Sequence, residues 1–377
     1  MKLSEVCLNI VDCPHSTAPD EGSGYALIRT PNIGKGRFNL EGVHRISEAA
    51  YKKRCARITP TVNDLILARE APAGNVAIIK ENMEQLALGQ RTVLIRPNPE
   101  MVYPDYLVYY LLAPKQQNEL LGRATGATVA HVNIPIINNL PISLPSLETQ
   151  QKIAGILSAY DDLIENNRKQ IKLLEEAAQK LYKEWFVKLN FPGHENTKIV
   201  DGVPEGWKKE KLGNLLPIVT GKKDANFGTK DGLYPFFTCS QEPIKAPSYS
   251  FDANAILLAG NGDLNVKIYR GKFEAYQRTY VLVPYQNEHL YICYRTIQDN
   301  LRKLIHGASG STIKFITKGM IEDIDVLIPN NEIILKFNNY SEVVLTKMEN
   351  LNNQIKLLQS ARDKLLSKLM NGELITN

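Results

Sequence analysis

The pentapeptide QIKLL occurs twice in this chain, at residues 170–174 and 354–358, and this repeat restricts the fold more than any other feature. The offset of 184 residues holds without a gap over a much longer stretch. The matching segments include Leu144-Pro145 with Ile328-Pro329, Lys180-Leu181 with Lys364-Leu365, and residues 124–128 with 308–312. We therefore expect a pseudo-two-fold tandem duplication in which each half ends in a long helix.

Apolar residues in both helices alternate three and four residues apart, which is a coiled-coil pattern. The predicted positions facing the partner helix, here called seam positions, are Leu157, Ile164, Asn167, Ile171, Leu174 and Leu181 in the first helix and Met348, Leu351, Ile355, Leu358, Arg362 and Leu365 in the second. Neither 156–189 nor 332–371 contains Pro or Gly, so nothing in them interrupts a helix. The pattern predicts two helices packed as an antiparallel coiled coil, and a buried helix hairpin in a large core is the alternative.

Two of the seam positions are polar, Asn167 and Arg362. Either they lie at the edge of the helix pair in water, or they fix the register of two antiparallel helices, as buried polar residues can.

Length and composition predict a globular protein with two or three cores, since 377 residues exceed one typical domain. No run of about 18 apolar residues occurs, and the N-terminus lacks the apolar segment of a secretory signal, so we expect no membrane association. The five cysteines form no CxxC pair, which indicates free thiols in a reducing compartment. A cytoplasmic protein is expected.

The chain divides by pattern into four parts of an α+β protein. The parts are a first globular domain of mixed α/β type (1–145), a spacer helix (146–190), a second such domain (191–327, with a polar linker at 191–206) and a C-terminal spacer helix (328–377). In the first domain, 64–68, 75–79 and 92–95 are predicted strands, and 104–112 is a predicted helix beginning at a proline. We expect 134–144 to leave the domain as an extended strand.

A search for catalytic motifs favours a non-catalytic chain. No P-loop sequence, dinucleotide-binding glycine pattern or Asn/Asp-Pro-Pro-Tyr/Phe motif of an adenine methyltransferase occurs, and the six histidines lack metal-ligand spacing. We therefore expect no metal and no cofactor in this chain. A net charge of +5 is compatible with nucleic-acid binding, but it is also common in ordinary enzymes.

Two variable globular domains, each followed by a Leu/Ile-Pro entry into a long helix, resemble the DNA-specificity subunit of type I restriction–modification enzymes. The residues that carry the resemblance are Leu144-Pro-Ser-Leu-Glu148, 151–157, Asp161-Asp-Leu-Ile164, 170–186, Gly126-Ala-Thr128, Pro204-Glu-Gly-Trp207 and the strand–loop segments 64–70 and 74–77. The second half departs from the pattern at Ile333-Ile-Leu335, where a Glu-Gln pair is usual. It also has Gly260-Asn-Gly262 in place of 69–74.

The resemblance implies that each domain recognises one half of a split, asymmetric site in double-stranded DNA while the helices hold the halves apart. Two methyltransferase subunits would dock on the helices and modify adenine, and two restriction–translocase subunits would complete the complex. S-adenosylmethionine, ATP and magnesium would then belong to those partners. Two other classes stay open, a stand-alone bipartite DNA-binding regulator and a coiled-coil scaffold without DNA binding.

The predicted spacer helix bounds the distance between the half-sites. A helix over residues 148–186 is roughly 58 Å long at 1.5 Å per residue. At about 3.4 Å per base pair, this limits the separation of half-site centres to roughly 17 base pairs.

Candidate DNA contacts lie in or beside loops. Lys35 and Arg37 occupy a glycine-rich turn, and Lys222 and Lys223 follow Gly221, so backbone and cation together could approach phosphates. Further candidates lie in or beside loops at corresponding places in the two halves of the chain, namely Arg69, His131, Asn261, Lys267, Arg270 and Lys314. Arginine can read guanine and asparagine adenine, although most exposed Lys and Arg are simply solvated.

Overall fold

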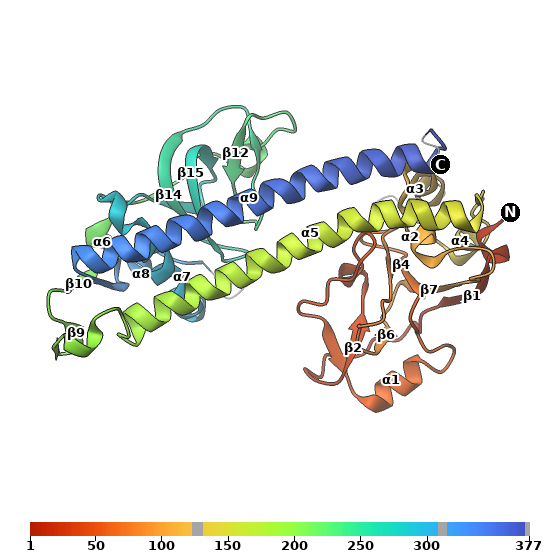
Figure 1. Ribbon diagram of the computed structural model, residues 1–377, viewed down its shortest axis with the longest axis horizontal. Helices are drawn as coiled ribbons and strands as arrows, with labels where there is room; N and C mark the ends of the chain where they lie inside the picture. Colours follow the sequence, from red (N-terminus) through yellow and green to blue (C-terminus); the bar gives the residue numbers. More distant parts are fainter. Residues whose placement is uncertain (123–130, 308–314, 374–377) are drawn as a thin grey trace. The chain divides into compact units, whose positions relative to one another are not determined.

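The computed structural model describes residues 1–122, 131–307 and 315–373, which form two compact units (Figure 1). The first unit comprises Met1–Asn167 and Asn353–Asn377, and the second comprises Arg168–Asn352. Both divisions lie beside a copy of QIKLL. Each unit therefore contains one sheet-based domain and a part of both long helices, whereas the sequence suggested four successive parts.

Two small sheets build the domain of the first unit. One has the antiparallel order β1-β7-β4-β5, and in the other β2 pairs antiparallel with β3 and parallel with β6. The strands are β1 (Cys7–Asp12), β2 (Tyr25–Ile28), β3 (His44–Ile46), β4 (Leu65–Ala68), β5 (Val76–Ile78), β6 (Leu86–Leu88) and β7 (Thr92–Pro97). The predicted strand–loop–strand unit corresponds to β4 and β5, in which Leu65 pairs with Ile78.

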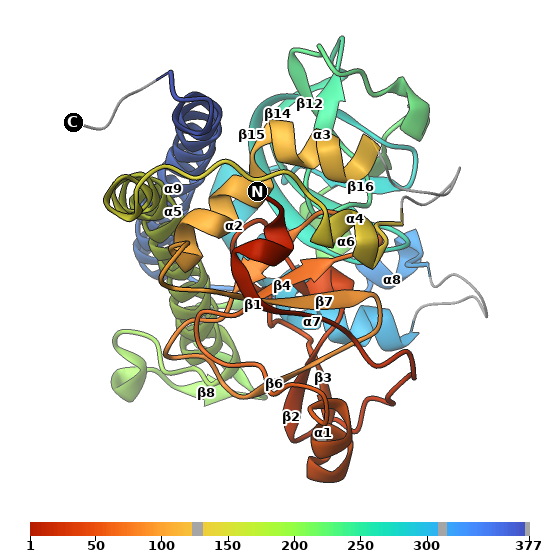
Figure 2. The same ribbon diagram turned by 90° about the vertical axis from the view of Figure 1, so that its right-hand side faces the viewer.

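Strand β4 is apolar throughout because both of its faces are buried. Alternate side chains of a strand point to opposite faces, so Leu65 and Leu67 enter one core while Ile66 and Ala68 enter another. The second core joins the two sheets, and α1 (Glu48–Arg54) covers the far side of the second sheet (Figure 2). The domain thus has two sheets between α1 on one side and α2 on the other.

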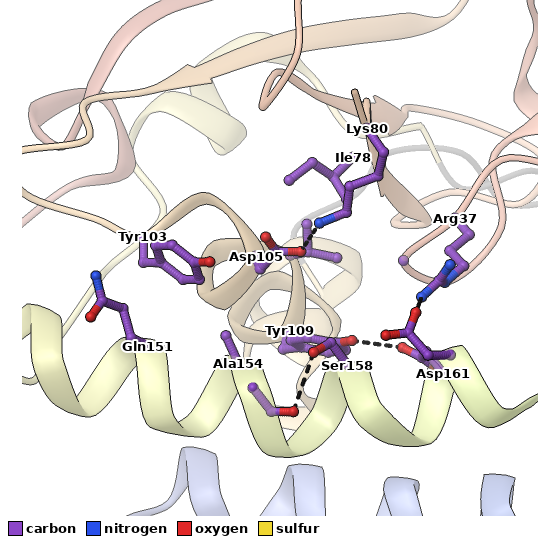
Figure 3. Close-up of a pocket in the computed structure, with 14 residues that line it drawn as sticks. Arg37, Ile78, Lys80, Tyr103, Asp105, Tyr109, Gln151, Ala154, Ser158 and Asp161 are labelled. Atoms are coloured by element: carbon purple, nitrogen blue, oxygen red, sulfur yellow. Dashed lines mark hydrogen bonds and ion pairs between the residues drawn. The ribbon is translucent and has the colours of Figure 1, made fainter. Parts of the chain in front are cut away.

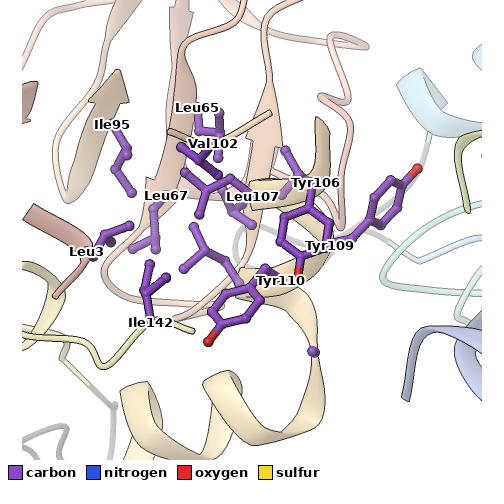
Figure 4. Packing of buried hydrophobic residues seen from close by; sticks show 14 of the residues in the cluster. Leu3, Leu65, Leu67, Ile95, Val102, Tyr106, Leu107, Tyr109, Tyr110 and Ile142 are labelled. Carbon is purple, nitrogen blue, oxygen red and sulfur yellow. The ribbon is translucent and has the colours of Figure 1, made fainter. Parts of the chain in front are cut away.

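Helix α2 (Pro104–Leu112) packs against the outer face of the first sheet and is buried on almost every side. It begins at a proline, as predicted, because the first turn of a helix needs no backbone N–H from that residue. Figure 4 shows Tyr106, Leu107 and Tyr110 on the side of the helix that faces Leu65, Leu67 and Ile95 of the sheet, whereas Tyr109 points away from them. Helix α3 (Pro114–Gly122) follows directly.

The second unit is built on one larger sheet with the order β11-β16-β14-β15-β12-β13. Its strands are β11 (Ile218–Thr220), β12 (Tyr234–Phe237), β13 (Ile244–Ala246), β14 (Phe251–Ala259), β15 (Val266–Ala275) and β16 (Thr279–Leu282). Two short pairs accompany it, β8 (Ile199–Val200) with β9 (Val203–Pro204), and β10 (Lys208–Lys211) with β17 (Asp325–Ile328). Helices α6 (Leu212–Leu215) and α7 (Leu290–Gly307) complete the domain, and α7 shares a core with β14 and β16.

The repeat offset is visible in the structure beyond the long helices. Helix α4 (Ile134–Asn138) and helix α8 (Lys318–Glu322) occupy positions 184 residues apart. The prediction of an extended strand over 134–144 is wrong for its first part, because Pro135 fits the first turn of a short helix. The chain is extended only afterwards, where Ile142 donates to the carbonyl of Met1 at 2.8 Å.

The two long helices are α5 (Leu147–Tyr182) and α9 (Asn331–Met370), and a wider helical turn over Lys183–Val187 continues α5. A polar side chain caps the first turn of each long helix. Ser146 Oγ accepts a hydrogen bond from the N–H of Thr149 at 3.3 Å, and Asn330 Oδ1 accepts one from the N–H of Ile333 at 3.0 Å. The mixed α/β class with two domains and two long helices is confirmed. Among the described residues, no helix has the length and apolar character needed to cross a membrane.

Candidate nucleic-acid interface

The loops that follow β4 and β14 occupy equivalent places in the two units. Two backbone hydrogen bonds of the first loop have counterparts in the second. Arg69 N donates to Arg91 O at 2.8 Å, as Gly260 N does to Arg278 O at 2.8 Å. Val132 N donates to Arg69 O at 3.0 Å, as Ile316 N does to Gly260 O at 2.8 Å. The backbone frame is thus shared, while the side chains it carries differ between the units.

In the first unit this loop carries a charged cluster that faces inward. Arg69 donates to both carboxylate oxygens of Asp12 at 2.9 and 3.0 Å and to the carbonyl of Val132 at 2.9 Å, and its side chain is 8% exposed. His131 lies between Arg69, at 2.8 Å, and Glu70, at 2.5 Å. A buried guanidinium requires such partners, so Arg69 holds the loop in place and is not presented to solvent.

In the second unit the same place carries a mostly neutral cluster. Asn261 Oδ1 accepts from the thiol of Cys239 at 3.0 Å, and Asn265 donates to the Cys239 carbonyl at 3.0 Å. Lys267 is hydrogen-bonded to Asn265 and donates to the Ser240 carbonyl at 2.7 Å. Burial lowers the pKa of Lys267. Two candidates, Asn261 and Lys267, are therefore brought together, while Lys314 lies outside the described residues.

The glycine-rich turn with Lys35 and Arg37 is directed at helix α5. Gly34 donates to the carbonyl of Arg37 at 2.9 Å, and Gly36 has a φ of +90° that favours glycine. The turn places Arg37 in an ion pair with Asp162 of α5. Lys35 borders a small cleft next to the same helix.

A cleft of about 400 Å³ lies between α2 and α5 in the first unit. Two ion pairs border it, that of Arg37 with Asp162 and that of Lys80 with Asp105. Tyr109 of α2 reaches across to α5, where its hydroxyl donates to Asp161 at 2.7 Å (Figure 3). Burial raises the pKa of the Tyr109 hydroxyl, and the negative charge of Asp161 raises it further. The cleft is thus bounded by polar contacts between the domain and its helix.

Arg270 is likewise directed at a long helix. It extends from β15 to Glu342 and Glu349 of α9, with nitrogen–oxygen distances of 2.5 and 2.7 Å. The predicted DNA contacts of Arg37 and Arg270 stay predictions, and their observed partners are carboxylates of the helices.

Lys222 and Lys223 lie in a surface loop after β11. Lys222 is exposed, and the ammonium of Lys223 lies 4.5 Å from the centre of the Phe227 ring. This loop therefore has the exposure that a contact with DNA phosphates requires.

If both lysines contact phosphates, replacing Lys222 and Lys223 with alanine will lower the salt dependence of DNA binding. The slope of log K against log salt concentration should fall by about two, since each neutralised phosphate contributes about 0.9. Binding titrations at several salt concentrations measure this slope. An unchanged slope would remove both residues from the interface.

The seam residues of the two helices are all buried or half-buried. Leu157, Ile164, Asn167, Leu351 and Ile355 are buried, and Ile171, Leu174, Leu181, Met348, Leu358, Arg362 and Leu365 are half-buried. In the first unit Leu157 shares a core with Leu366 and Leu369, and in the second the Phe186 and Phe337 rings lie 4.8 Å apart. Each unit thus contains contacts between α5 and α9, while coiled-coil packing stays a prediction.

Both polar seam residues have partners on the other long helix within the first unit. Asn167 donates to Gln354 Oε1 at 3.1 Å, and Arg362 donates to Asp161 Oδ1 at 2.6 Å. Asp161 is 7% exposed and also accepts from Tyr109. Asp161 is not among the predicted seam positions, although it lies four residues after Leu157 and eight after Ile153 and so faces the same side of the helix.

The fold thus defines a two-domain protein built by duplication, with each domain attached to the same pair of long helices. Residues 1–176 and 204–366 match the model of the type I restriction modification DNA specificity domain. The chain belongs to this family, which confirms the resemblance seen in its sequence.

Individual relatives agree with this assignment. The EcoDI type I restriction enzyme specificity subunit of Escherichia coli is 39% identical over 176 residues, which cover 46% of this chain and 39% of that protein. The MjaIX specificity subunit of Methanocaldococcus jannaschii is 29% identical over 365 residues, covering 88% of this chain and 82% of that protein. A crystal structure of the type I restriction–modification S subunit of M. genitalium has the same fold, with a TM-score of 0.58 and 16% identity over 98% of this chain and 95% of that one.

Proposed function

We propose that this chain recognises a bipartite, asymmetric DNA site for a type I restriction–modification complex, each domain reading one half-site. The observation that carries the proposal is the duplication itself, in which two matching backbone frames bear different side chains. One frame holds the inward-facing Arg69–Asp12–His131 cluster and the other holds Asn261 with Lys267. Two readers with different chemistry on one pair of helices correspond to two different half-sites with an unread gap.

The same helices are the docking platform for two methyltransferase subunits. Leu173 and Leu357 are equivalent residues of the two QIKLL copies, and they are 63% and 71% exposed. Ile156 and Tyr340 are a second equivalent pair of exposed apolar residues. Exposed apolar residues that recur at the repeat offset support two equivalent partners more than they support chance exposure.

This chain acts without catalysis of its own in the proposed complex. Adenine methylation with S-adenosylmethionine takes place on the two methyltransferase subunits. Cleavage with ATP and magnesium takes place on two restriction–translocase subunits. The described residues contain no group of three or more potential metal ligands, and the proposal assigns no cofactor to this chain.

DNA binding by the full chain with and without a methyltransferase distinguishes this function from its alternatives. We expect tight, salt-dependent and site-specific binding only when the methyltransferase subunits are present, because in the proposed function this chain reads DNA as part of a complex with them. Tight specific binding by the chain alone would identify a stand-alone regulator. The absence of any salt-dependent affinity under both conditions would identify a scaffold without a DNA role.

A further inference from the structure

Four side chains of the second domain and of α9 form a polar network beside their shared apolar core. Arg270 of β15 contacts Glu342 and Glu349 of α9, and the hydroxyl of Tyr291 of α7 donates to Glu342. The Arg270 side chain is 26% exposed and those of Glu342 and Glu349 are 50% and 46% exposed, so water screens these contacts in part. The hydrogen bond from Tyr291, followed by that from Arg270, lowers the pKa of Glu342, which keeps this carboxylate ionised.

The apolar core and the network together attach the domain to α9 along several turns of the helix. The core includes Ile333 and Phe337 near the start of the helix, and Leu345 packs against it further along. The network contacts α9 at Glu342 and, one turn beyond Leu345, at Glu349. From Phe337 to Glu349 the helix rises about 18 Å. Contacts spread over this length fix the angle between the domain and the helix, and Arg270 supplies the contact at Glu349.

We propose that Arg270 is a positioning residue that fixes the angle of the second recognition domain on α9 and thereby determines how strictly the gap length of the DNA site is enforced. The inference rests on the proposed function. One base pair corresponds to about 3.4 Å along the duplex. A small tilt of the domain about its apolar contact is enough to move its reading loops by that distance, so a loosened network accepts neighbouring gap lengths.

The first unit carries an arrangement of the same kind, made from residues that are not equivalent in the repeat. Tyr109 of its domain donates to Asp161 of α5, and Arg37 pairs with the adjacent Asp162. In both units a tyrosine and an arginine of the recognition domain therefore bind carboxylates of a long helix. Independent construction of the same type of contact in two diverged domains supports a shared requirement for a fixed domain angle.

Variants on the two sides of the network separate this role from a DNA contact. The full chain with its methyltransferase partners is tested as Arg270→Gln, as Glu342→Gln with Glu349→Gln, and as the triple variant. Lys336→Gln is the control, because it removes an ion pair with Glu332 that lies within α9. The readout is adenine methylation on a library of sites whose gaps differ by one base pair, together with the salt slope of binding.

The readout is the ratio of methylation at sites whose gap is one base pair too long or too short to methylation at sites with the preferred gap. We expect Arg270→Gln to raise this ratio by about tenfold, because a hydrogen bond to a charged group is lost. The double variant Glu342→Gln, Glu349→Gln should give the same change. The triple variant should add nothing further, since the charged contact of Arg270 with the two carboxylates is lost in all three. The salt slope and the control should stay unchanged. Arg270→Lys, which retains a charge, should restore part of the stringency.

Two results would overturn the inference. The first is an unchanged gap preference in all network variants. The second is a salt slope lowered by about one in Arg270→Gln alone, which identifies a phosphate contact. If the unaltered chain directs methylation to no split site, the proposed function fails first, and this outcome is distinct from both.

Discussion

A chain with seven extra residues in each long helix will direct methylation to sites whose gap is longer by two or three base pairs. The insertions belong after Asn167 and after Asn352, at the divisions between the two compact units and beside QIKLL. Seven residues keep the heptad pattern in phase and lengthen each helix by about 10.5 Å, which corresponds to at most about three base pairs. Methylation at the original gap should fall by about tenfold or more, because the DNA would have to be deformed to fit.

Sequencing of methylated adenines in cells that express the lengthened chain and its methyltransferase measures this shift. The matched control carries the insertion in α5 alone, which leaves the two helices of unequal length. We expect that control to lose methylation without gaining a new gap. An unchanged gap in the doubly lengthened chain would show that the helices do not set the distance between half-sites.

Replacing Arg362 with alanine is expected to lower the free energy of unfolding of the first unit by about 3 kcal/mol. The substitution leaves Asp161, which is 7% exposed, without its charged partner. Breaking a buried ion pair from one side typically costs about 3–5 kcal/mol, and the remaining hydrogen bond from Tyr109 places this case at the low end. Urea unfolding followed by circular dichroism measures the change.

The duplication provides a matched variant for this ion pair. Positions 161 and 362 correspond to Leu345 and Ala178 in the other half of the repeat, where the residues are apolar. A chain with Asp161→Leu, Arg362→Ala and Tyr109→Phe should recover most of the lost stability, because buried ion pairs can be exchanged for apolar residues at little cost. A triple variant as unstable as Arg362→Ala would show that the charge itself is not the cause.

The long helices and the duplication could be predicted from sequence because both depend on regular spacing. The heptad pattern predicted helices whose observed bounds are Leu147–Tyr182 and Asn331–Met370. The short helix Ile134–Asn138 could not be predicted, since five residues carry no clear period. The order of the strands also depends on long-range pairing, as in the parallel contact of β2 with β6, which no local pattern encodes.

The candidate site was predicted less well, because charge and loop position do not reveal what a side chain binds. The sequence predicts Arg37, Arg69 and Arg270 as DNA contacts because they are cations in or beside loops. Their carboxylate partners Asp162, Asp12 and Glu342 lie 125, 57 and 72 residues away in the chain. Pairs at such separations leave no local signature. The polar seam position Arg362 was recognised from its place in the heptads, but its partner Asp161 appeared only in the structure.

Sequencing of methylated adenines after co-expression of this chain with a type I methyltransferase subunit tests the central claim most directly. We expect methylation within one bipartite motif, with two different half-sites separated by a gap of constant length. Replacing residues 207–327 with the second recognition domain of a relative should change one half-site and leave the other half-site unaltered. Methylation within a continuous motif, or a motif that changes in both halves after this replacement, would contradict the account.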